Sequence, residues 1–102
     1  MIYRISRAAQ TDVAEIWRSI AVSSGSEQIA NKVEEELYTA IKKLGRNPRM
    51  GHIRAEIDDD SVRFWSVYSI LIAYRIEKSV LVVVRVIRGA RDLRKIFRRK
   101  RG

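Results

Sequence analysis

The chain has 102 residues with 21 Lys or Arg, 12 Asp or Glu and a net charge of +9. This length favours one domain over residues 1–102 with one hydrophobic core. One His and no Cys are too few for a zinc site, a disulfide framework or thiol chemistry, so we expect no metal and no cofactor. Without a signal-peptide or membrane-span pattern, the composition predicts a small cytoplasmic protein that does not enter a membrane and has an anionic partner.

The first half of the sequence predicts a strand followed by two helices. Residues 2–6 alternate weakly, and Ser6 can cap a helix over residues 8–21. A short Ser- and Gly-containing link precedes a second helix over residues 27–44, and we expect Gly45 to end it. The short link predicts an antiparallel hairpin. Apolar residues at helical spacing predict its buried stripe: Val13, Ile16, Trp17, Ile20, Val33, Leu37 and Ile41.

The second half predicts three strands in series. Residues 46–51 form a loop, residues 52–57 an extended edge segment, and residues 58–61 (DDDS) a turn. Strands are expected at 62–67, 69–76 and 79–88, and tight turns between them indicate an antiparallel meander. The predicted fold class is therefore α+β, in the order β-αα-βββ. The N-terminal strand and the helical hairpin would pack on one face of an antiparallel sheet and leave the other face largely open.

Positive charge is concentrated at the C-terminal end. From Arg85 onward the chain carries nine Lys or Arg and one acid, a net charge of +8, whereas the first 84 residues carry +1. A cationic field this local is typical of a surface that contacts an anionic partner. Residues 98–102 alone are better interpreted as a solvated basic tail.

Catalytic chemistry has few candidate residues. His52 lies in a predicted loop, where a surface role is expected, and residues 58–60 (DDD) are more typical of a solvated turn than of an acid–base pair. Arginines remain, because a guanidinium can hold a phosphate with two hydrogen bonds. An RNase built mainly on arginines is chemically possible, but no proton shuttle is evident.

Several segments in register share a pattern with one known family. They are residues 6–12 (SRAAQTD) leading into 16–17 (IW), 48–51 (PRMG), 62–63 (VR), 68–75 (YSILIAYR) and 85–93 (RVIRGARDL). The closing R-V-x-x-G-A-R-D-L is the most specific of them. Together they cover nearly the whole chain and resemble the RelE/ParE toxins of bacterial type II toxin–antitoxin modules, whose fold has the same β-αα-βββ order.

The resemblance implies one of two mechanisms. RelE-like members cut mRNA in the ribosomal A site, and ParE-like members poison DNA gyrase. Arg91 matches the Arg that follows the last strand in RelE-like enzymes, but Phe97 stands where a Tyr would transfer a proton. The middle-strand position of a base falls within the apolar pair 71–72 (LI). The resemblance is therefore closer to ParE, and implies a non-enzymatic gyrase inhibitor neutralised by a cognate antitoxin.

The resemblance and the charge pattern together predict two contact sets. A ParD-like antitoxin with an acidic, amphipathic C-terminal segment would bind the sheet face that the helices leave open. The antitoxin-binding residues are predicted to be Leu81, Val83, Arg85, Arg88 and Arg91. The target-binding residues are predicted to be Arg88, Arg91, Arg94, Lys95 and Arg98. An ion pair or helix cap within residues 91–92 is the structural alternative for Arg91.

Two other functions remain open from the sequence. A ribosome-dependent mRNA endonuclease would have the ribosome as its partner and would bind phosphates with Arg63, Arg88 and Arg91. A plain nucleic-acid-binding module would bind naked DNA or RNA with steep salt dependence. Nothing in the sequence indicates a helix that reads a DNA groove.

Overall fold

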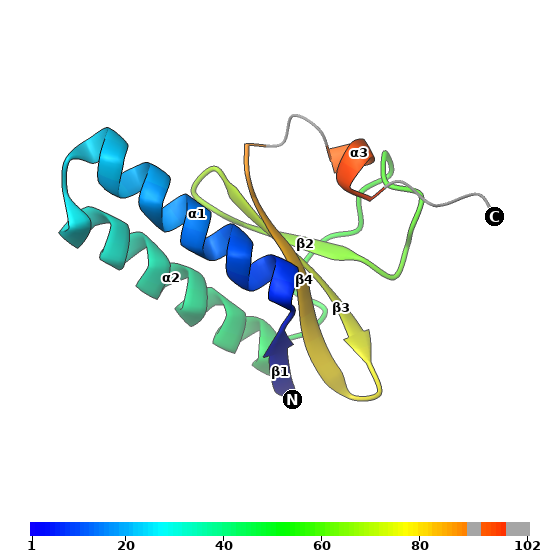
Figure 1. Cartoon of the computed structure of the whole chain (residues 1–102). Coiled ribbons are helices and arrows are strands. Elements are labelled where there is room, and N and C mark those ends of the chain that lie inside the picture. The colour runs from blue at the N-terminus through cyan, green and yellow to red at the C-terminus, as the bar shows by residue number, and fades with distance from the viewer. Residues whose placement is uncertain (90–92, 98–102) are drawn as a thin grey trace.

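The computed structural model describes residues 1–89 and 93–97. Its elements are, in order, β1 (Ile2–Ile5), α1 (Arg7–Ser24), α2 (Glu27–Arg46), β2 (Arg63–Val67), β3 (Ile70–Glu77), β4 (Val80–Arg88) and the short α3 (Leu93–Ile96) (Figure 1). The predicted α+β class and the β-αα-βββ order are confirmed, with α3 added after the last strand. No helix in residues 1–89 and 93–97 is long and apolar enough to span a membrane.

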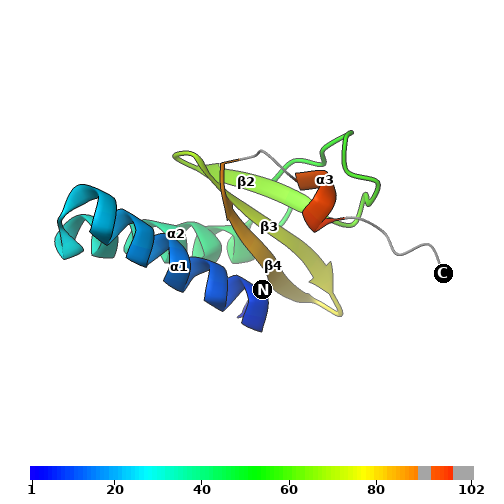
Figure 2. The same ribbon diagram turned by 45° about the horizontal axis from the view of Figure 1, so that its top comes forward.

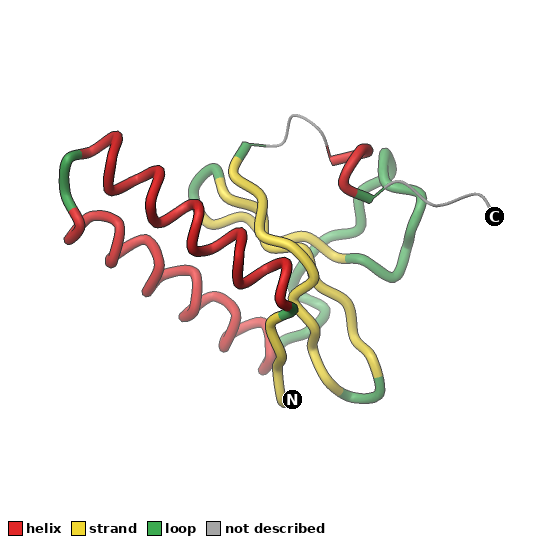
Figure 3. The backbone as a smooth tube through the Cα atoms, viewed as in Figure 1, coloured by secondary structure: helices red, strands yellow, loops and turns green. Residues whose placement is uncertain are grey.

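Local capping explains the helical hairpin. The hydroxyl of Ser6 accepts a hydrogen bond from the Ala9 N–H at 3.1 Å, and Ser26 does the same for Ile29 at 3.2 Å. Gly25 ends α1 in the left-handed conformation at φ 68°, which an L-residue with a Cβ adopts only with strain. The hairpin therefore turns within two residues, and α1 and α2 lie side by side (Figure 3).

The prediction that Gly45 ends the second helix is wrong. The helix continues through Gly45 to Arg46, and the Asn47 N–H donates to the carbonyls of Lys43 and Leu44. A Cβ on Gly45 would lie 3.1 Å from the Met1 carbonyl oxygen. The glycine therefore allows the chain before β1 to approach α2 closely, a requirement that local sequence does not show.

The sheet is mixed and has the strand order β1-β4-β3-β2. The meander β2-β3-β4 is antiparallel, as predicted, whereas β1 pairs with β4 in parallel, from Ile2 opposite Val80 to Ile5 opposite Val83. The parallel pair follows from the helical hairpin, which returns the chain to the same end of the sheet. Because β4 lies between β1 and β3, it is a central strand.

The helices cover one face of the sheet and build the helix-side core (Figure 2). Predicted stripe residues Val13, Ile16, Ile20, Leu37 and Ile41 are buried there, and Trp17 and Val33 are partly buried against it. The strands contribute Ile70, Ile72, Tyr74, Leu81, Val83 and Val86. This packing confirms the predicted inward stripe of the hairpin.

The opposite face of the sheet is not open, contrary to the prediction. The loop between α2 and β2 and the helix α3 bring apolar side chains onto it and form a second core. Its buried members are Ile57, Val62, Phe64, Leu71, Ala73, Ile87 and Leu93, and Val84, Ile96 and Phe97 are partly buried against them. This cover was missed because neither the loop nor the four-residue α3 has a regular apolar period.

The predicted exposure of Leu81 and Val83 is also wrong. Both side chains are 0% exposed in the helix-side core. β4 is apolar at nearly every position, as expected for a strand buried on both faces, so its sequence does not reveal which side chains face the helices. A register shift beside Tyr74, which pairs with Val83, puts Ala73 opposite Arg85.

Candidate functional site

The free edge of β4 beyond β1 is closed by side chains at the start of α1. The Ser6 N–H donates to the Val83 carbonyl and the Ser6 hydroxyl to the Val84 carbonyl, both at 3.0 Å. Two residues further along β4, the Val86 N–H donates to the Asp12 carboxylate at 2.9 Å. The Ser6 backbone and the side chains of Ser6 and Asp12 thus take the place of a neighbouring strand as hydrogen-bond partners of β4 beyond the end of β1.

Asp12 also holds Arg85. Its carboxylate accepts hydrogen bonds from Arg85 Nε at 2.7 Å and from Nη2 at 3.0 Å, a two-pronged pair. The hydrogen bond to Asp12 raises the pKa of Arg85, so the guanidinium is firmly charged. An acidic partner that contacted Arg85 would have to compete with Asp12.

Arg88 ends β4 on the surface. Its side chain reaches back to α1, where Nη1 donates to the Ser19 hydroxyl at 3.0 Å. Gly89 follows at φ 77°, and its N–H donates to the Ser69 carbonyl at 3.0 Å. The predicted contact residues Arg91 and Arg98 lie outside the described residues.

The helix α3 places two cations on the surface. Leu93 is buried in the second core, and the Phe97 ring meets the Phe64 ring edge-on, with centroids 5.5 Å apart. Arg94 and Lys95 are exposed between these apolar anchors. Arg88, Arg94 and Lys95 are the predicted target-binding residues that the structure describes, and we call them the basic end.

Arg63 holds a loop rather than standing free. Its Nη1 donates to the Gly51 carbonyl at 2.9 Å. Tyr74 holds the same loop, because its hydroxyl donates to the Pro48 carbonyl at 2.7 Å and accepts from the Gly51 N–H at 2.9 Å. Burial raises the pKa of Tyr74, which keeps the hydroxyl protonated.

The structure does not bring Arg63 and Arg88 together. Arg63 lies in the row of Tyr74 and Val83, while Arg88 pairs with Ile70. The two rows are four residues apart along β3, and the strands are two apart, so the Cα atoms are separated by roughly 16 Å. Their side chains also hold different partners, Arg63 the Gly51 carbonyl and Arg88 the Ser19 hydroxyl, so the two guanidinium groups do not converge on one phosphate in this structure. The described residues also contain no group of three or more His, Cys, Asp or Glu side chains able to hold a metal ion.

Comparison with known proteins places this geometry in a family. Residues 3–93 match the family model described as the ParE toxin of the type II toxin–antitoxin system parDE. The chain belongs to the ParE toxin family. The predicted resemblance to ParE is confirmed. The β4 edge closed by Ser6 and Asp12, the loop held by Tyr74, and Arg88 lie within the matched residues, whereas Arg94 and Lys95 lie beyond them.

A solved structure supports the same fold. A chain of the chromosomal ParDE toxin–antitoxin system from P. aeruginosa superposes with a TM-score of 0.75 at 20% identity, covering 87% of this chain and 96% of that one. At this identity the likeness shows the shared ParE-like fold alone. A comparison with curated proteins returns no match.

Sequence reasoning missed Asp12 and Tyr74 as organising residues. Asp12 lies within the SRAAQTD segment, but its partners are 73 and 74 positions away. Tyr74 was the one polar group in a run of buried strand residues, and a buried hydroxyl normally has a partner. That rule could have predicted that the Tyr74 hydroxyl has a hydrogen-bond partner, but not that the partner is the loop at residues 48–51.

Proposed function

We propose that this ParE-family toxin inhibits DNA gyrase by binding the enzyme and stalling it on cleaved DNA. The observation that carries the proposal is Phe97, which stands where a RelE-like nuclease would have a proton-transferring Tyr. Its ring packs edge-on against Phe64 in the second core, and a phenyl ring has no proton to exchange. A toxin that acts by occupying its target needs no such group.

The middle of the sheet supports a non-enzymatic mechanism. Leu71 is 5% exposed and Ile72 is 0% exposed, so the strand positions expected to hold a base are apolar and offer no group that could exchange a proton. Arg63 is bonded to Gly51 and lies far from Arg88. Neither proton transfer nor convergent phosphate binding is supported within the described residues.

The basic end is the proposed gyrase contact. Arg94 and Lys95 are exposed on α3 and Arg88 is exposed at the end of β4, with Arg91 and Arg98 in the same stretch of sequence. Exposed cations raise the rate of association with an anionic partner, and salt weakens this attraction by screening it. Anchoring of α3 by Leu93 and Phe97 keeps two of these cations on a fixed support.

The proposed regulatory partner is a cognate ParD-like antitoxin with an acidic, amphipathic C-terminal segment. The related P. aeruginosa structure is described as a ParDE system. A segment that folds on binding can neutralise the charge of the basic end. Its binding stays reversible, because ordering the segment costs free energy. Arg88 is exposed and donates to the neutral Ser19 hydroxyl, which a carboxylate can replace, whereas Arg85 is bonded to the charged Asp12.

Two gel assays and one translation assay test the proposal. Purified toxin should inhibit gyrase supercoiling, accumulate gyrase-cleaved DNA, and leave mRNA intact on translating ribosomes. Adding the antitoxin should restore supercoiling. Codon-specific cuts in ribosome-bound mRNA without gyrase inhibition would replace this function with the endonuclease.

A further inference from the structure

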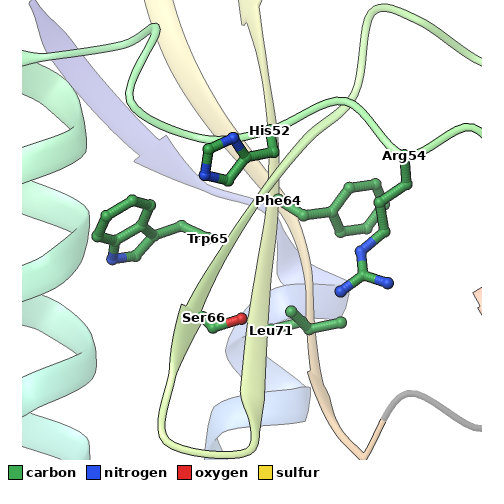
Figure 4. Close-up of a pocket in the computed structure, with 6 residues that line it drawn as sticks. All are labelled: His52, Arg54, Phe64, Trp65, Ser66 and Leu71. Atoms are coloured by element: carbon green, nitrogen blue, oxygen red, sulfur yellow. The ribbon is translucent and has the colours of Figure 1, made fainter.

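A cavity lies at the free edge of β2, away from the basic end's strand β4. It encloses about 220 Å³ and is lined by His52, Arg54, Phe64, Trp65, Ser66 and Leu71. His52 bridges to Phe64 through two backbone hydrogen bonds, both at 2.8 Å. Figure 4 shows the side chains around this bridge, with Trp65 pointing to one side of the strands and Phe64 lying beside Arg54 on the other. The loop thus adds one bridge to the sheet and then leaves its edge free.

Two aromatic side chains, His52 and Trp65, line this cavity, and Trp65 also packs against the helix-side core, whereas Phe64 belongs to the second core. The rings of His52 and Trp65 are nearly parallel, at 23°, with centroids 6.4 Å apart. His52 is exposed and Trp65 is half-buried, so solvent reaches the pair. Flat ring faces of this kind stack on planar heteroaromatic groups with little dependence on which base is present.

A cation lies at the same cavity. The Arg54 guanidinium carbon is 5.6 Å from the Phe64 ring centroid. Its ion pair with Glu56 is 3.5 Å long and exposed, so the pair is weak and an incoming anion can displace the carboxylate. A phosphate would gain a charge-assisted hydrogen bond there.

The backbone at Ser66 supplies a polar edge. Phe64 directs its N–H and C=O outward to His52, and peptide groups two residues apart along a strand point to the same side. The Ser66 N–H and C=O therefore face the free edge of β2 beside the cavity. An adjacent donor and acceptor is the pattern that the hydrogen-bonding edge of a base can pair with.

We propose that this cavity binds an unpaired nucleobase of a single-stranded nucleic acid, with the base stacked on Trp65 and His52 and its phosphate against Arg54. The rings, the donor–acceptor pair and the cation match the face, edge and backbone of a nucleotide. The net charge of +9 favours a polyanion over a neutral planar ligand. This site goes beyond the proposed function, because neither gyrase inhibition nor antitoxin binding requires it.

Tryptophan fluorescence tests the proposal in the full chain. The protein has two tryptophans, so Trp17→Phe leaves Trp65 as the reporter. A short single-stranded oligodeoxyadenylate should quench the Trp65 emission to saturation, and the matching oligoriboadenylate should do so too. A duplex of the same sequence should quench it much less, since its bases are already stacked.

Variants separate stacking from simple charge attraction, with binding followed by the anisotropy of a labelled strand. Trp65→Leu should weaken binding about five- to 150-fold, the range for losing one base–aromatic stack. Trp65→Phe keeps a ring face and should stay within a few-fold of the parent. Arg54→Gln should weaken binding more than Arg18→Gln, which removes the same charge from an exposed position on α1.

Three results would overturn the site. The first is unchanged binding by Trp65→Leu with an intact thermal melt. The second is equal quenching of Trp65 by duplex and single strand. The third is quenching by polyglutamate but not by the oligonucleotides, which would assign the free edge of β2 to an acidic peptide strand. Gyrase inhibition is measured separately, so failure here leaves the proposed function standing.

Discussion

At the scale of single residues, the Asp12 carboxylate accepts three hydrogen bonds from the last strand. Asp12 is buried, at 9% exposure, and it ties the start of α1 to the last strand through Arg85 and Val86. Removing one partner of a buried pair leaves the other charged and unpaired, which costs more than the pair contributes. The side chain of Arg85 is 36% exposed, so water offsets part of that cost.

We expect Asp12→Ala to lower the free energy of unfolding by about 2–4 kcal/mol, because Arg85 and the Val86 N–H both lose their acceptor. Urea denaturation measures the change. Glu35→Ala, which removes an exposed acid from α2, is the matched control and should change stability by less than about 0.5 kcal/mol. In a double-mutant cycle, Asp12→Ala with Arg85→Ala should destabilise less than the sum of the two single changes. Additive losses would show that the pair does not couple.

Tyr74 gives a prediction about pH. Tyr74→Phe should cost about 1–3 kcal/mol at neutral pH, because the Gly51 N–H and the Pro48 carbonyl lose a buried partner. Burial raises the pKa of Tyr74 above 10.0 in the folded chain, so the hydroxyl's contribution is present below that pH. It is lost as the pH rises, because the unfolded chain then releases the proton first. Denaturation across alkaline pH should show the gap between wild type and Tyr74→Phe narrowing; a widening gap would contradict the assignment.

At the scale of elements, sequence predicted what depends on near neighbours. The cap at Ser6, the helical stripe and the three meander strands follow from residues a few positions apart. The side of the sheet to which Leu81 and Val83 point could not be predicted, because the first five residues of this central strand are all apolar and do not alternate with polar residues. The cover of the second face was missed for a related reason: the side chains that cover it, Ile57, Val62 and Leu93, come from an irregular loop and a single helical turn.

The residue that follows α3, Phe97, gives a prediction about chemistry. We expect Phe97→Tyr to leave ribosome-bound mRNA uncut, because the change adds a hydroxyl without a base or a convergent phosphate site. Leu71 and Ile72 stay buried and apolar, and Arg63 stays bonded to Gly51. Primer extension on mRNA from programmed ribosomes reads the outcome, with wild-type toxin as control. New codon-specific stops would show that the nuclease scaffold is otherwise intact.

At the scale of the whole molecule, most of the net positive charge lies in the C-terminal stretch from Arg85 onward. The order of elements and the family could be predicted from the sequence, since the quoted segments run through the matched residues 3–93. The proposed contact surface could be predicted only as a stretch of cations. Arg85, counted among them, is bonded to Asp12, and that pairing depends on the folded position of α1. Arg88, Arg94 and Lys95 are the described members that remain exposed.

The most direct test of the gyrase proposal is DNA cleavage by gyrase in the presence of matched charge variants. One variant changes Arg88, Arg94 and Lys95 to Gln, and the control changes the exposed Arg7, Arg18 and Lys32 to Gln, so both lose the same charge. Both should keep the wild-type melting temperature within a few degrees. We predict that the basic-end variant loses most of the accumulation of cleaved DNA while the control retains it. Equal activity of the two folded variants, or no cleaved DNA with wild-type toxin, would contradict the account.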